Sequence, residues 1–170
     1  MPVSFPRKGS HAPLYYARNL THSPEGSQMY NPRYWDGLPM PLYPFGYGLS
    51  YTTFEFNNLK VSATQTKIGE TLTVSVDLTN TGEVAGDEVA QLYIHQKWGT
   101  DTRPMRELKG FQRITLQPGE TRSITFQLGP SELEYWSTNA RKWIQDATAF
   151  DLWVGADSQA SLHADFEVVA

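Results

Sequence analysis

The most regular stretch of the chain reads Thr71-Leu72-Thr73-Val74-Ser75-Val76-Asp77-Leu78. Its large apolar residues stand at every second position and alternate with small or polar ones. Successive side chains of a β-strand point to opposite faces, so this spacing places all the large apolar groups on one side. The stretch is therefore predicted to be a strand with one buried face.

Further strand patterns follow toward the carboxy terminus. Residues 86–95 are apolar on both faces, as in a central strand, and Gln117-Pro118-Gly119-Glu120 is a turn signal. The other expected strands cover residues 107–116, 121–128, 150–154 and 162–168. Ser131-Glu132-Leu133-Glu134 has the form of a capping box and predicts one short helical turn. About six or seven strands with so little helix predict an all-β, immunoglobulin-like antiparallel β-sandwich.

The composition indicates a folded domain and argues against several classes of function. Of the 170 residues, 39% are hydrophobic and 13% are aromatic, which is enough for a core. The net charge is −4 with no long run of either sign, which argues against nucleic-acid and anionic-membrane partners. The absence of cysteine excludes disulfides and thiolate sites. No apolar run approaches the roughly 20 residues of a membrane span, and the first residues lack the apolar core of a signal peptide.

The amino-terminal part of the chain has a different character. Residues 1–56 hold eight of the eleven prolines and seven of the nine tyrosines. No helical or alternating period persists there, so residues 1–40 are predicted to form an extended, mostly irregular arm. An aromatic-rich arm of this kind has nothing of its own to fold around, and we expect it to belong on the surface of a partner.

Residues 41–56 are expected to be a rigid junction between the arm and a sandwich that covers residues 57–170. Its two prolines restrict φ, and Gly46 and Gly48 can adopt positive φ. The glycines alternate with large side chains that are costly to leave in water, namely Phe45, Tyr47, Leu49 and Tyr51. The junction should therefore pack against something on each side, with its aromatic side chains covering an edge of the sandwich.

Several motifs carry a resemblance to a known family. They are Pro44-Phe45-Gly46-Tyr47-Gly48-Leu49-Ser50-Tyr51-Thr52-Thr53-Phe54, Leu78-Thr79-Asn80-Thr81-Gly82 with Val84-Ala85-Gly86-Asp87-Glu88-Val89-Ala90-Gln91-Leu92-Tyr93, Arg103-Pro104-Met105-Arg106-Glu107-Leu108-Lys109-Gly110-Phe111, and Leu116-Gln117-Pro118-Gly119-Glu120. In this order they resemble the carboxy-terminal part of glycoside hydrolase family 3 β-glucosidases. The resemblance implies a fibronectin type III-like sandwich from about Phe54 onward, preceded by the tail of an α/β domain. One departure is Gln145-Asp146-Ala147-Thr148, where many relatives have a Glu-Pro-Gly turn.

The resemblance implies a module without catalytic residues. Retaining hydrolysis needs a nucleophilic carboxylate and an acid/base carboxylate about 5 Å apart. In this family the nucleophile is an Asp of an amino-terminal barrel and the acid/base lies in the α/β domain, and no position of this chain matches either. We therefore expect no catalytic residue, no cofactor and no metal, and no activity of the chain alone. Met1 looks like an internal methionine of a longer gene or the start of a truncated reading frame.

The expected role is to stabilise and orient the barrel and α/β domains of a complete β-glucosidase, which hydrolyses terminal β-D-glucosyl residues. The resemblance also suggests a periplasmic or secreted location. The candidate domain-junction residues are Arg33, Tyr34, Trp35, Asp36, Phe45, Gly46, Tyr47, Gly48 and Tyr51.

A stand-alone carbohydrate-binding module is the alternative, because exposed aromatic side chains can stack on sugars. Trp98 lies in a polar loop, and Trp153 alternates outward from its strand. These two tryptophans are the candidate sugar-stacking residues, with β-glucosides or glucans as ligands.

Other constellations favour structural roles. Gly48-Leu49-Ser50-Tyr51-Thr52 lacks the strand-to-helix context of a nucleophile elbow. The four histidines show no metal-ligand spacing, and His163 is expected to be solvated. Asp87-Glu88 has no further oxygen ligands nearby, which favours a capping or solvated role over a cation site.

Overall fold

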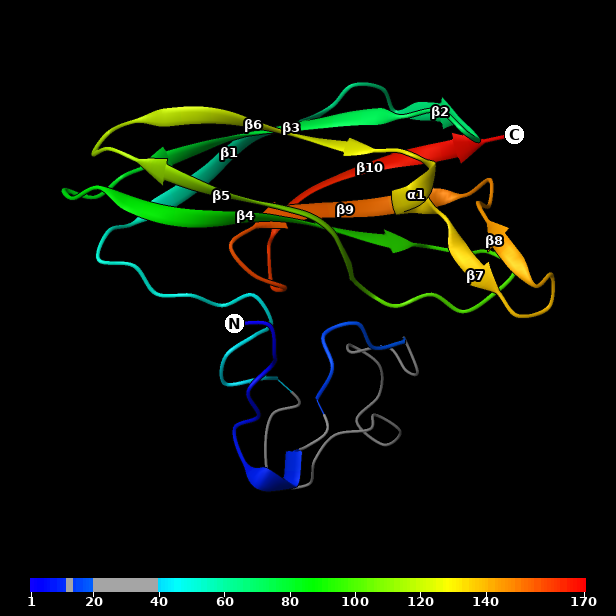
Figure 1. Cartoon of the computed structure of the whole chain (residues 1–170), viewed down its shortest axis with the longest axis horizontal. Coiled ribbons are helices and arrows are strands. Elements are labelled where there is room, and N and C mark those ends of the chain that lie inside the picture. Colours follow the sequence, from blue (N-terminus) through cyan, green and yellow to red (C-terminus); the bar gives the residue numbers. More distant parts are fainter. Residues whose placement is uncertain (12–13, 20–39) are drawn as a thin grey trace, which may run out of the picture.

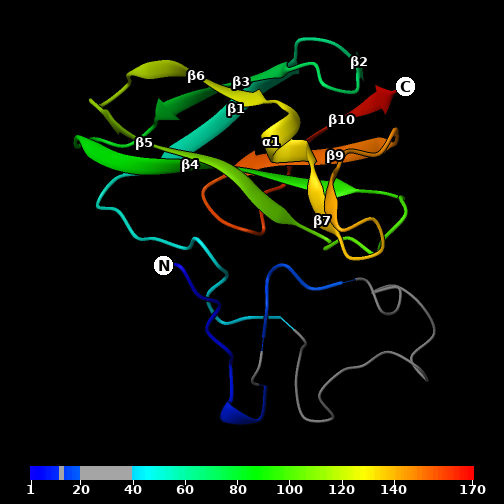
Figure 2. The same ribbon diagram turned by 45° about the vertical axis from the view of Figure 1, so that its right-hand side comes forward.

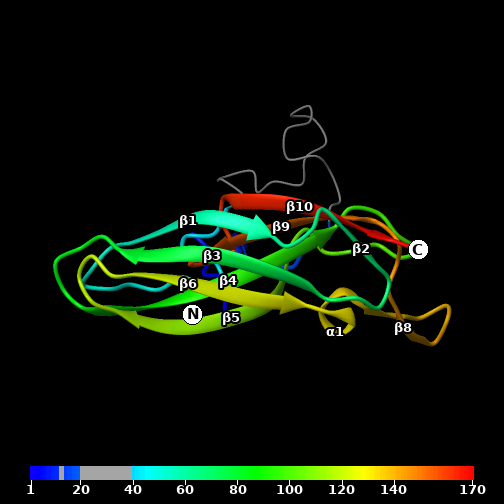
Figure 3. The same cartoon turned by 90° about the horizontal axis from the view of Figure 1, so that it is seen from above.

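The computed structural model describes residues 1–11, 14–19 and 40–170, and it contains a β-sandwich with the amino-terminal segments on one side (Figure 1). One sheet has three strands in the order β1-β3-β6, and the other has five in the order β2-β10-β9-β4-β5. A separate hairpin, β7-β8, lies at one end of the sandwich (Figure 1). Figure 3 shows the three-stranded sheet lying over the five-stranded one.

The strands of the sandwich are β1 (Phe54–Val61), β2 (Gln65–Lys67), β3 (Leu72–Asn80), β4 (Gly86–Gln96), β5 (Glu107–Leu116), β6 (Thr121–Leu128), β9 (Ala149–Gly155) and β10 (Leu162–Val169). The hairpin consists of β7 (Tyr135–Ser137) and β8 (Lys142–Ile144), and the helical pieces are η1 (Gly9–His11) and α1 (Pro130–Leu133). Neighbouring strands run antiparallel except for β2, which pairs in parallel with β10.

The core lies between the two sheets. Strand β3 supplies the four alternating residues on which the fold prediction rests, and all of them are buried. They face buried residues of the other layer, which include Leu92, Ile94, Leu152 and Phe166. The rings of Phe150 and Phe166 stack with centroids 5.1 Å apart. The predicted all-β sandwich is confirmed, and the strands expected over residues 107–116 and 121–128 have those bounds.

The predicted helical turn is present but begins earlier than expected. Its N-cap is Gly129, and the Glu132 carboxylate accepts a hydrogen bond from the Gly129 N–H at 2.8 Å. The prediction that Ser131 caps the turn and Glu134 reaches back is therefore wrong. Pro130 explains the difference, because its fixed φ and missing N–H suit the first position of a helix.

The described part of the arm lies against the outer face of the five-stranded sheet, away from the three-stranded sheet (Figures 1 and 2). Phe5 and Tyr43 form an isolated antiparallel bridge, and Asn19 forms another with Pro104. The Met105 N–H donates to the Arg18 carbonyl at 2.8 Å. These contacts tie two described arm segments to the junction and to the loop between β4 and β5.

Candidate functional site

The outer face of the five-stranded sheet is polar where the arm and the junction cover it. Because side chains alternate along a strand, β4 directs Leu92 and Ile94 into the core and Gln91 and Tyr93 to the outer face. Both outward residues are nevertheless buried. Gly46 and Tyr16 from before Phe54 help to cover them, together with the β9–β10 loop, so this face is the place where the amino-terminal part of the chain meets the sandwich.

Gln91 is the polar centre of this contact. Its Nε2 donates to the Gly46 carbonyl at 3.2 Å and also to the Ala156 carbonyl. Its Oε1 accepts a hydrogen bond from the Tyr93 hydroxyl at 2.6 Å. Burial raises the pKa of the Tyr93 phenol, which keeps the hydroxyl protonated as the donor. A buried amide with all these partners fixes the junction backbone to β4.

Gly46 is required at this contact for two reasons. Its φ is +86°, a conformation that L side chains rarely adopt. A Cβ at this position would lie 2.2 Å from the Gln91 Oε1, so a side chain there would displace the amide. The junction can therefore approach β4 this closely only with glycine.

Aromatic rings complete the junction contact. Phe45 stacks on Tyr16 of the arm with centroids 4.1 Å apart, and Tyr16 meets the edge of Tyr93 at 6.0 Å. The Ser158 N–H donates to the Phe45 carbonyl at 2.8 Å. Tyr47 packs on Tyr43 at 5.0 Å. The arm, the junction and the sheet thus share one aromatic cluster.

Not all of the junction packs as predicted. Phe45, Gly46 and Tyr47 are partly buried, but Leu49 is 88% exposed and Tyr51 is 101% exposed. Gly48 is exposed too, and a Cβ there would meet nothing within 4 Å. The prediction that Tyr51 covers an edge of the sandwich is therefore wrong.

The backbone anchors on either side explain this exposure. Thr52 donates through its Oγ1 to the Asn80 Oδ1 at 2.6 Å, and the Thr81 N–H donates to the Thr53 carbonyl at 2.8 Å. Thr52 faces the β3–β4 turn, so Tyr51, the residue before it, points away from the sandwich. The four remaining junction candidates, Arg33, Tyr34, Trp35 and Asp36, lie outside the described residues.

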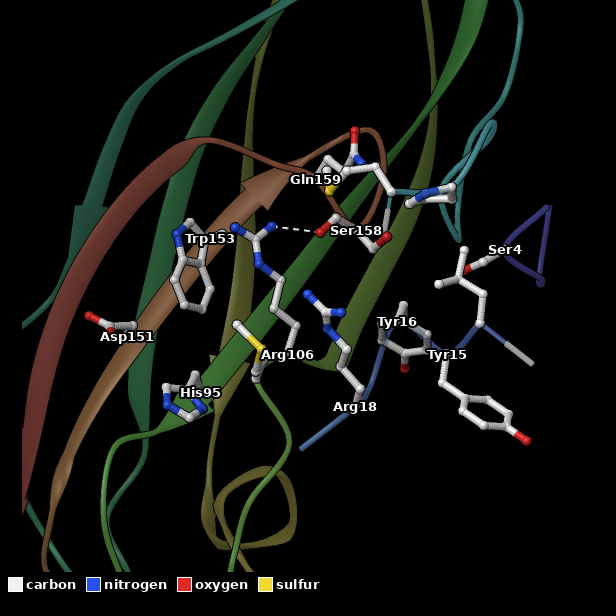
Figure 4. Close-up of a pocket in the computed structure, with 14 residues that line it drawn as sticks. Ser4, Tyr15, Tyr16, Arg18, His95, Arg106, Asp151, Trp153, Ser158 and Gln159 are labelled. Atoms are coloured by element: carbon white, nitrogen blue, oxygen red, sulfur yellow. Dashed lines mark hydrogen bonds between the residues drawn. The ribbon is translucent and has the colours of Figure 1, made fainter. Parts of the chain in front are cut away.

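A cavity of about 670 Å³ lies beside this contact, between the arm and the outer face of β4 and β9 (Figure 4). Its apolar wall includes Met40, Pro41 and Met105. Its polar and aromatic lining includes Arg18, His95, Arg106, Asp151 and Trp153. The cavity is large enough for a small ligand, since typical ligand pockets measure about 300 to 1,000 Å³.

Arg106 is held on the wall of this cavity by two hydrogen bonds and one ring contact. Its Nη1 donates to the carbonyls of Ser158 at 2.7 Å and Ala160 at 2.8 Å. Its guanidinium lies 4.3 Å from the ring centroid of Trp153, a cation–π geometry. Burial lowers the pKa of Arg106, while the nearby Tyr93 and Asp157 act in the opposite direction. Arg106 therefore holds the β9–β10 loop and Trp153 in place.

Trp153 has neighbours where the prediction expected an open ring. It is half-buried, with Arg106 over the ring and the imidazole of His163 at 5.4 Å. His163 also lies 2.9 Å from the Asp151 Oδ1, and Lys97 Nζ lies 3.0 Å from the same oxygen. His163 is exposed, as expected, and it also contacts Asp151, while Arg106 covers one face of the Trp153 ring.

Trp98 remains open. It is 66% exposed in the loop after β4. Its carbonyl is fixed by hydrogen bonds from the Gln96 Nε2 at 3.1 Å and the Thr148 Oγ1 at 2.7 Å. The backbone is thus held while the indole projects into solvent.

Asp146 organises the same loop, and sequence reasoning did not find it. Its Oδ2 accepts hydrogen bonds from the Gln96 Nε2 at 2.9 Å, the Tyr135 hydroxyl at 2.8 Å and the Thr100 N–H at 3.2 Å. The departure of residues 145–148 from the family's usual turn was the available signal. These partners show that the substituted turn ties the β4–β5 loop to β7.

Asp87 and Glu88 have separate structural partners. Asp87 accepts hydrogen bonds from Thr115 Oγ1 and pairs with Arg113, and these two contacts lower the pKa of its carboxyl. Burial raises the pKa of Glu88. Among the described residues no group of three or more His, Asp or Glu could hold a metal ion. None of the helices in the described part of the chain is long and apolar enough to cross a membrane.

Comparisons with known proteins agree on one family of enzymes. A family model described as a fibronectin type III-like domain matches residues 88–158. The periplasmic β-glucosidase of Salmonella typhimurium is 37% identical over 99% of this chain and 22% of that protein. A β-xylosidase of Formosa agariphila is 41% identical over 94% of this chain and 21% of that protein.

Solved structures give the same result. The β-glucosidase of Listeria innocua in complex with glucose matches with a TM-score of 0.90 and 32% identity, over 99% of this chain and 24% of that one. A β-glucosidase from Erythrobacter marinus matches with a TM-score of 0.88 and 33% identity, over 99% of this chain and 21% of that one. The chain thus spans about a fifth of the length of the proteins that it resembles.

Proposed function

Since the chain carries a fibronectin type III-like domain and corresponds to the carboxy-terminal part of a glycoside hydrolase family 3 β-glucosidase, we propose that it is a non-catalytic module that stabilises and orients the catalytic domains of such an enzyme. Its partners are the barrel and α/β domains, and the complete enzyme hydrolyses terminal β-D-glucosyl residues. Residues 1–40 are the tail of the α/β domain, residues 41–56 are the junction, and residues 57–170 are the module.

One observation carries this proposal: Leu49 and Tyr51 are 88% and 101% exposed on a backbone that is fixed at both ends. Gly46 is held by Gln91 on one side, and Thr52 is held by Asn80 on the other. Burying a side chain of this size contributes about 1.5 to 3 kcal/mol relative to leaving it in water. A rigid segment that presents two such side chains outward is suited to pack against a neighbouring domain.

Leu42 and Tyr43 are two further exposed apolar residues, earlier in the junction. They are 47% and 40% exposed, so the first part of the junction also offers apolar area. We call the exposed side chains of Leu42, Tyr43, Leu49 and Tyr51 the junction surface. In this proposal the junction surface contacts the α/β domain.

The simplest test uses the chain alone. Without a nucleophile and an acid/base, the purified chain should release no p-nitrophenol from an aryl β-glucoside above buffer. Turnover that disappears when Asp87 or Glu88 is replaced by Ala would contradict the proposal, because the active site would then lie in this chain.

A stronger test places the chain in a complete enzyme. The corresponding region of the Listeria innocua β-glucosidase would be replaced by this chain, and the temperature of activity loss would be measured. The chimera should be active, and Leu49→Ser with Tyr51→Ser should lower that temperature. Ile68→Ser is the matched control, since Ile68 is a 46% exposed apolar residue of the β2–β3 turn, away from the junction. If the double variant and Ile68→Ser lower the temperature of activity loss equally, docking through the junction surface is contradicted.

The exposure of Trp98 favours a second candidate function, the binding of β-glucosides or glucans by a carbohydrate-binding module. Retention of the chain on insoluble glucan, abolished by Trp98→Ala, would support this function. Trp153→Ala is the comparison, because Arg106 already covers that ring.

The name of one relative supports a proposed location. The Salmonella typhimurium protein is named a periplasmic β-glucosidase, which supports a periplasmic or secreted location for the complete enzyme. Fractionation of the source cells with an antibody against the module tests it, and signal confined to the cytoplasm would contradict it.

A further inference from the structure

Arg18 differs from every other charged residue on the wall of the cavity. Its backbone is fixed, because its carbonyl accepts the Met105 N–H at 2.8 Å and Asn19 bridges to Pro104. Its guanidinium makes no hydrogen bond and no ion pair with any of the described residues. In Figure 4 this side chain extends from the arm into the same cavity as Arg106. A guanidinium offers five donors in a fixed fork, so Arg18 presents to the cavity donors that no described residue uses.

The other charges of the cavity are already balanced. Asp151 is paired with Lys97 at 3.0 Å and with His163 at 2.9 Å. Asp157 lies near Arg106, and its Oδ1 accepts the Gln159 N–H at 2.7 Å. Nδ1 of His95 donates to the Pro104 carbonyl at 2.7 Å. The surplus in this cavity is therefore the positive charge and the donors of the Arg18 guanidinium.

We propose that this cavity binds a small molecule that carries a carboxylate or a phosphate, with Arg18 as the main ligand of the oxyanion. A guanidinium binds such groups with two parallel hydrogen bonds. Met40, Pro41 and Met105 supply an apolar wall for the remainder of the molecule. The cavity volume of about 670 Å³ admits a molecule of the size of a sugar acid or a sugar phosphate.

The cavity lies between the amino-terminal part of the chain and the sandwich, so a bound molecule would affect how the arm docks. Arg18, Met40 and Pro41 come from the arm and the junction, whereas His95, Met105 and Trp153 belong to the sandwich and its loops. A bound oxyanion therefore contacts both parts and favours the docked arm, since a ligand that binds only one state stabilises it.

The test uses the full chain and inorganic phosphate or glucuronate as probes. Glucose is the neutral comparison, and chloride keeps the ionic strength constant. The chain has five tryptophans, so its indole N–H signals in a proton–nitrogen NMR spectrum can be assigned by substitution. Trp153→Phe identifies the signal of the tryptophan that lines the cavity. Phosphate, glucuronate or both should shift this signal saturably, and glucose should not.

Two arginine variants locate the site. Arg18→Gln should weaken the binding at least about tenfold, the effect of losing one charge-assisted contact of roughly 1.4 kcal/mol. Arg7→Gln, a change at another exposed arginine of the arm that does not line the cavity, should leave the binding unchanged. The guanidinium of Arg18 makes no hydrogen bond and no ion pair with the described residues, so its variant should keep the melting temperature. No saturable shift with either anion, an equal shift with glucose, or unchanged binding by Arg18→Gln would overturn the proposal.

Discussion

Replacing Gly46 with Ala tests the contact between the junction and the sheet. The new Cβ would lie 2.2 Å from the Gln91 Oε1, so the amide must move. Gln91 would then lose its hydrogen bond to the Gly46 carbonyl, and the hydroxyl of Tyr93 would lose its acceptor in a buried site. We expect Gly46→Ala to destabilise the folded chain.

The expected loss of stability in Gly46→Ala is the sum of two free-energy costs. A residue other than glycine at a φ of +86° costs about 1 to 2 kcal/mol. A buried polar group left without its partner costs about 1 to 3 kcal/mol more. The free energy of unfolding should therefore fall by about 2 to 5 kcal/mol, which is a large part of the roughly 5 to 15 kcal/mol of a typical domain.

The assay is urea unfolding followed by circular dichroism, with Gly69→Ala as the matched control. Gly69 has a φ of +88°, but a Cβ there would meet nothing within 4 Å, so only the conformational cost applies. In a Gln91→Ala background the extra cost of Gly46→Ala should disappear, because the clashing amide is gone. If Gly46→Ala and Gly69→Ala cost the same in the parent chain, Gln91 does not fix the junction.

Three further predictions concern the rest of the chain. A chain that begins at residue 52 should be less stable than one that begins at residue 41, by about 1 to 3 kcal/mol because Gln91 loses the Gly46 carbonyl, and coincident urea melts of the two would contradict this. Asp146→Ala should lower the free energy of unfolding by about 2 to 4 kcal/mol, because three donors lose their acceptor, and an unchanged urea midpoint would show that the turn is dispensable. Burial raises the pKa of Glu88 in the folded chain above the unfolded value of 4.5, so its ionised form costs stability at neutral pH. Glu88→Gln should accordingly raise the free energy of unfolding at pH 7, and the gain should shrink as the pH falls toward 4.5; a gain that is independent of pH would contradict this cause.

Strict alternation made most of the sandwich predictable. Strands β3, β6 and β10 repeat their apolar residues at every second position, and a period of two admits one face for burial. Strand β4 was recognised by apolar residues on both faces. Its outer face is covered by the junction at Gln91 and by Tyr16 of the arm at Tyr93, which explains why Tyr93 is buried there.

Strand β1 was missed because its alternation is interrupted. Phe54 and Phe56 face the core, and so do Leu59 and Val61, but a bulge between Asn57 and Lys60 shifts the register between the two pairs. Asn58 takes a φ of 55° there. An extra residue changes which positions face inward, so a search for a period of two does not find the strand.

The candidate site was only partly predictable for a different reason. Gly46 and Phe45 stood out by residue type, but their partners Gln91 and Tyr16 are distant in the sequence and carry no local pattern. Arg106 and Asp146 likewise act through contacts with remote backbone groups and side chains. Composition and periodicity do not contain such pairings, which arise only when the sheet brings the segments together.

The burial of Tyr51 in a complete enzyme tests the central claim most directly. The chain has no cysteine, so Tyr51→Cys introduces a single thiol whose labelling by an alkylating reagent can be followed by mass spectrometry. In the free chain it should be labelled as fast as Ile68→Cys. In the chimera with the Listeria innocua catalytic domains, the labelling of Tyr51→Cys should be at least about tenfold slower, while the labelling of Ile68→Cys stays fast. A free-energy cost of about 1.4 kcal/mol for exposing the buried thiol corresponds to that tenfold change. Equal labelling rates of Tyr51→Cys in the free chain and in an active chimera would contradict a module that docks through its junction surface.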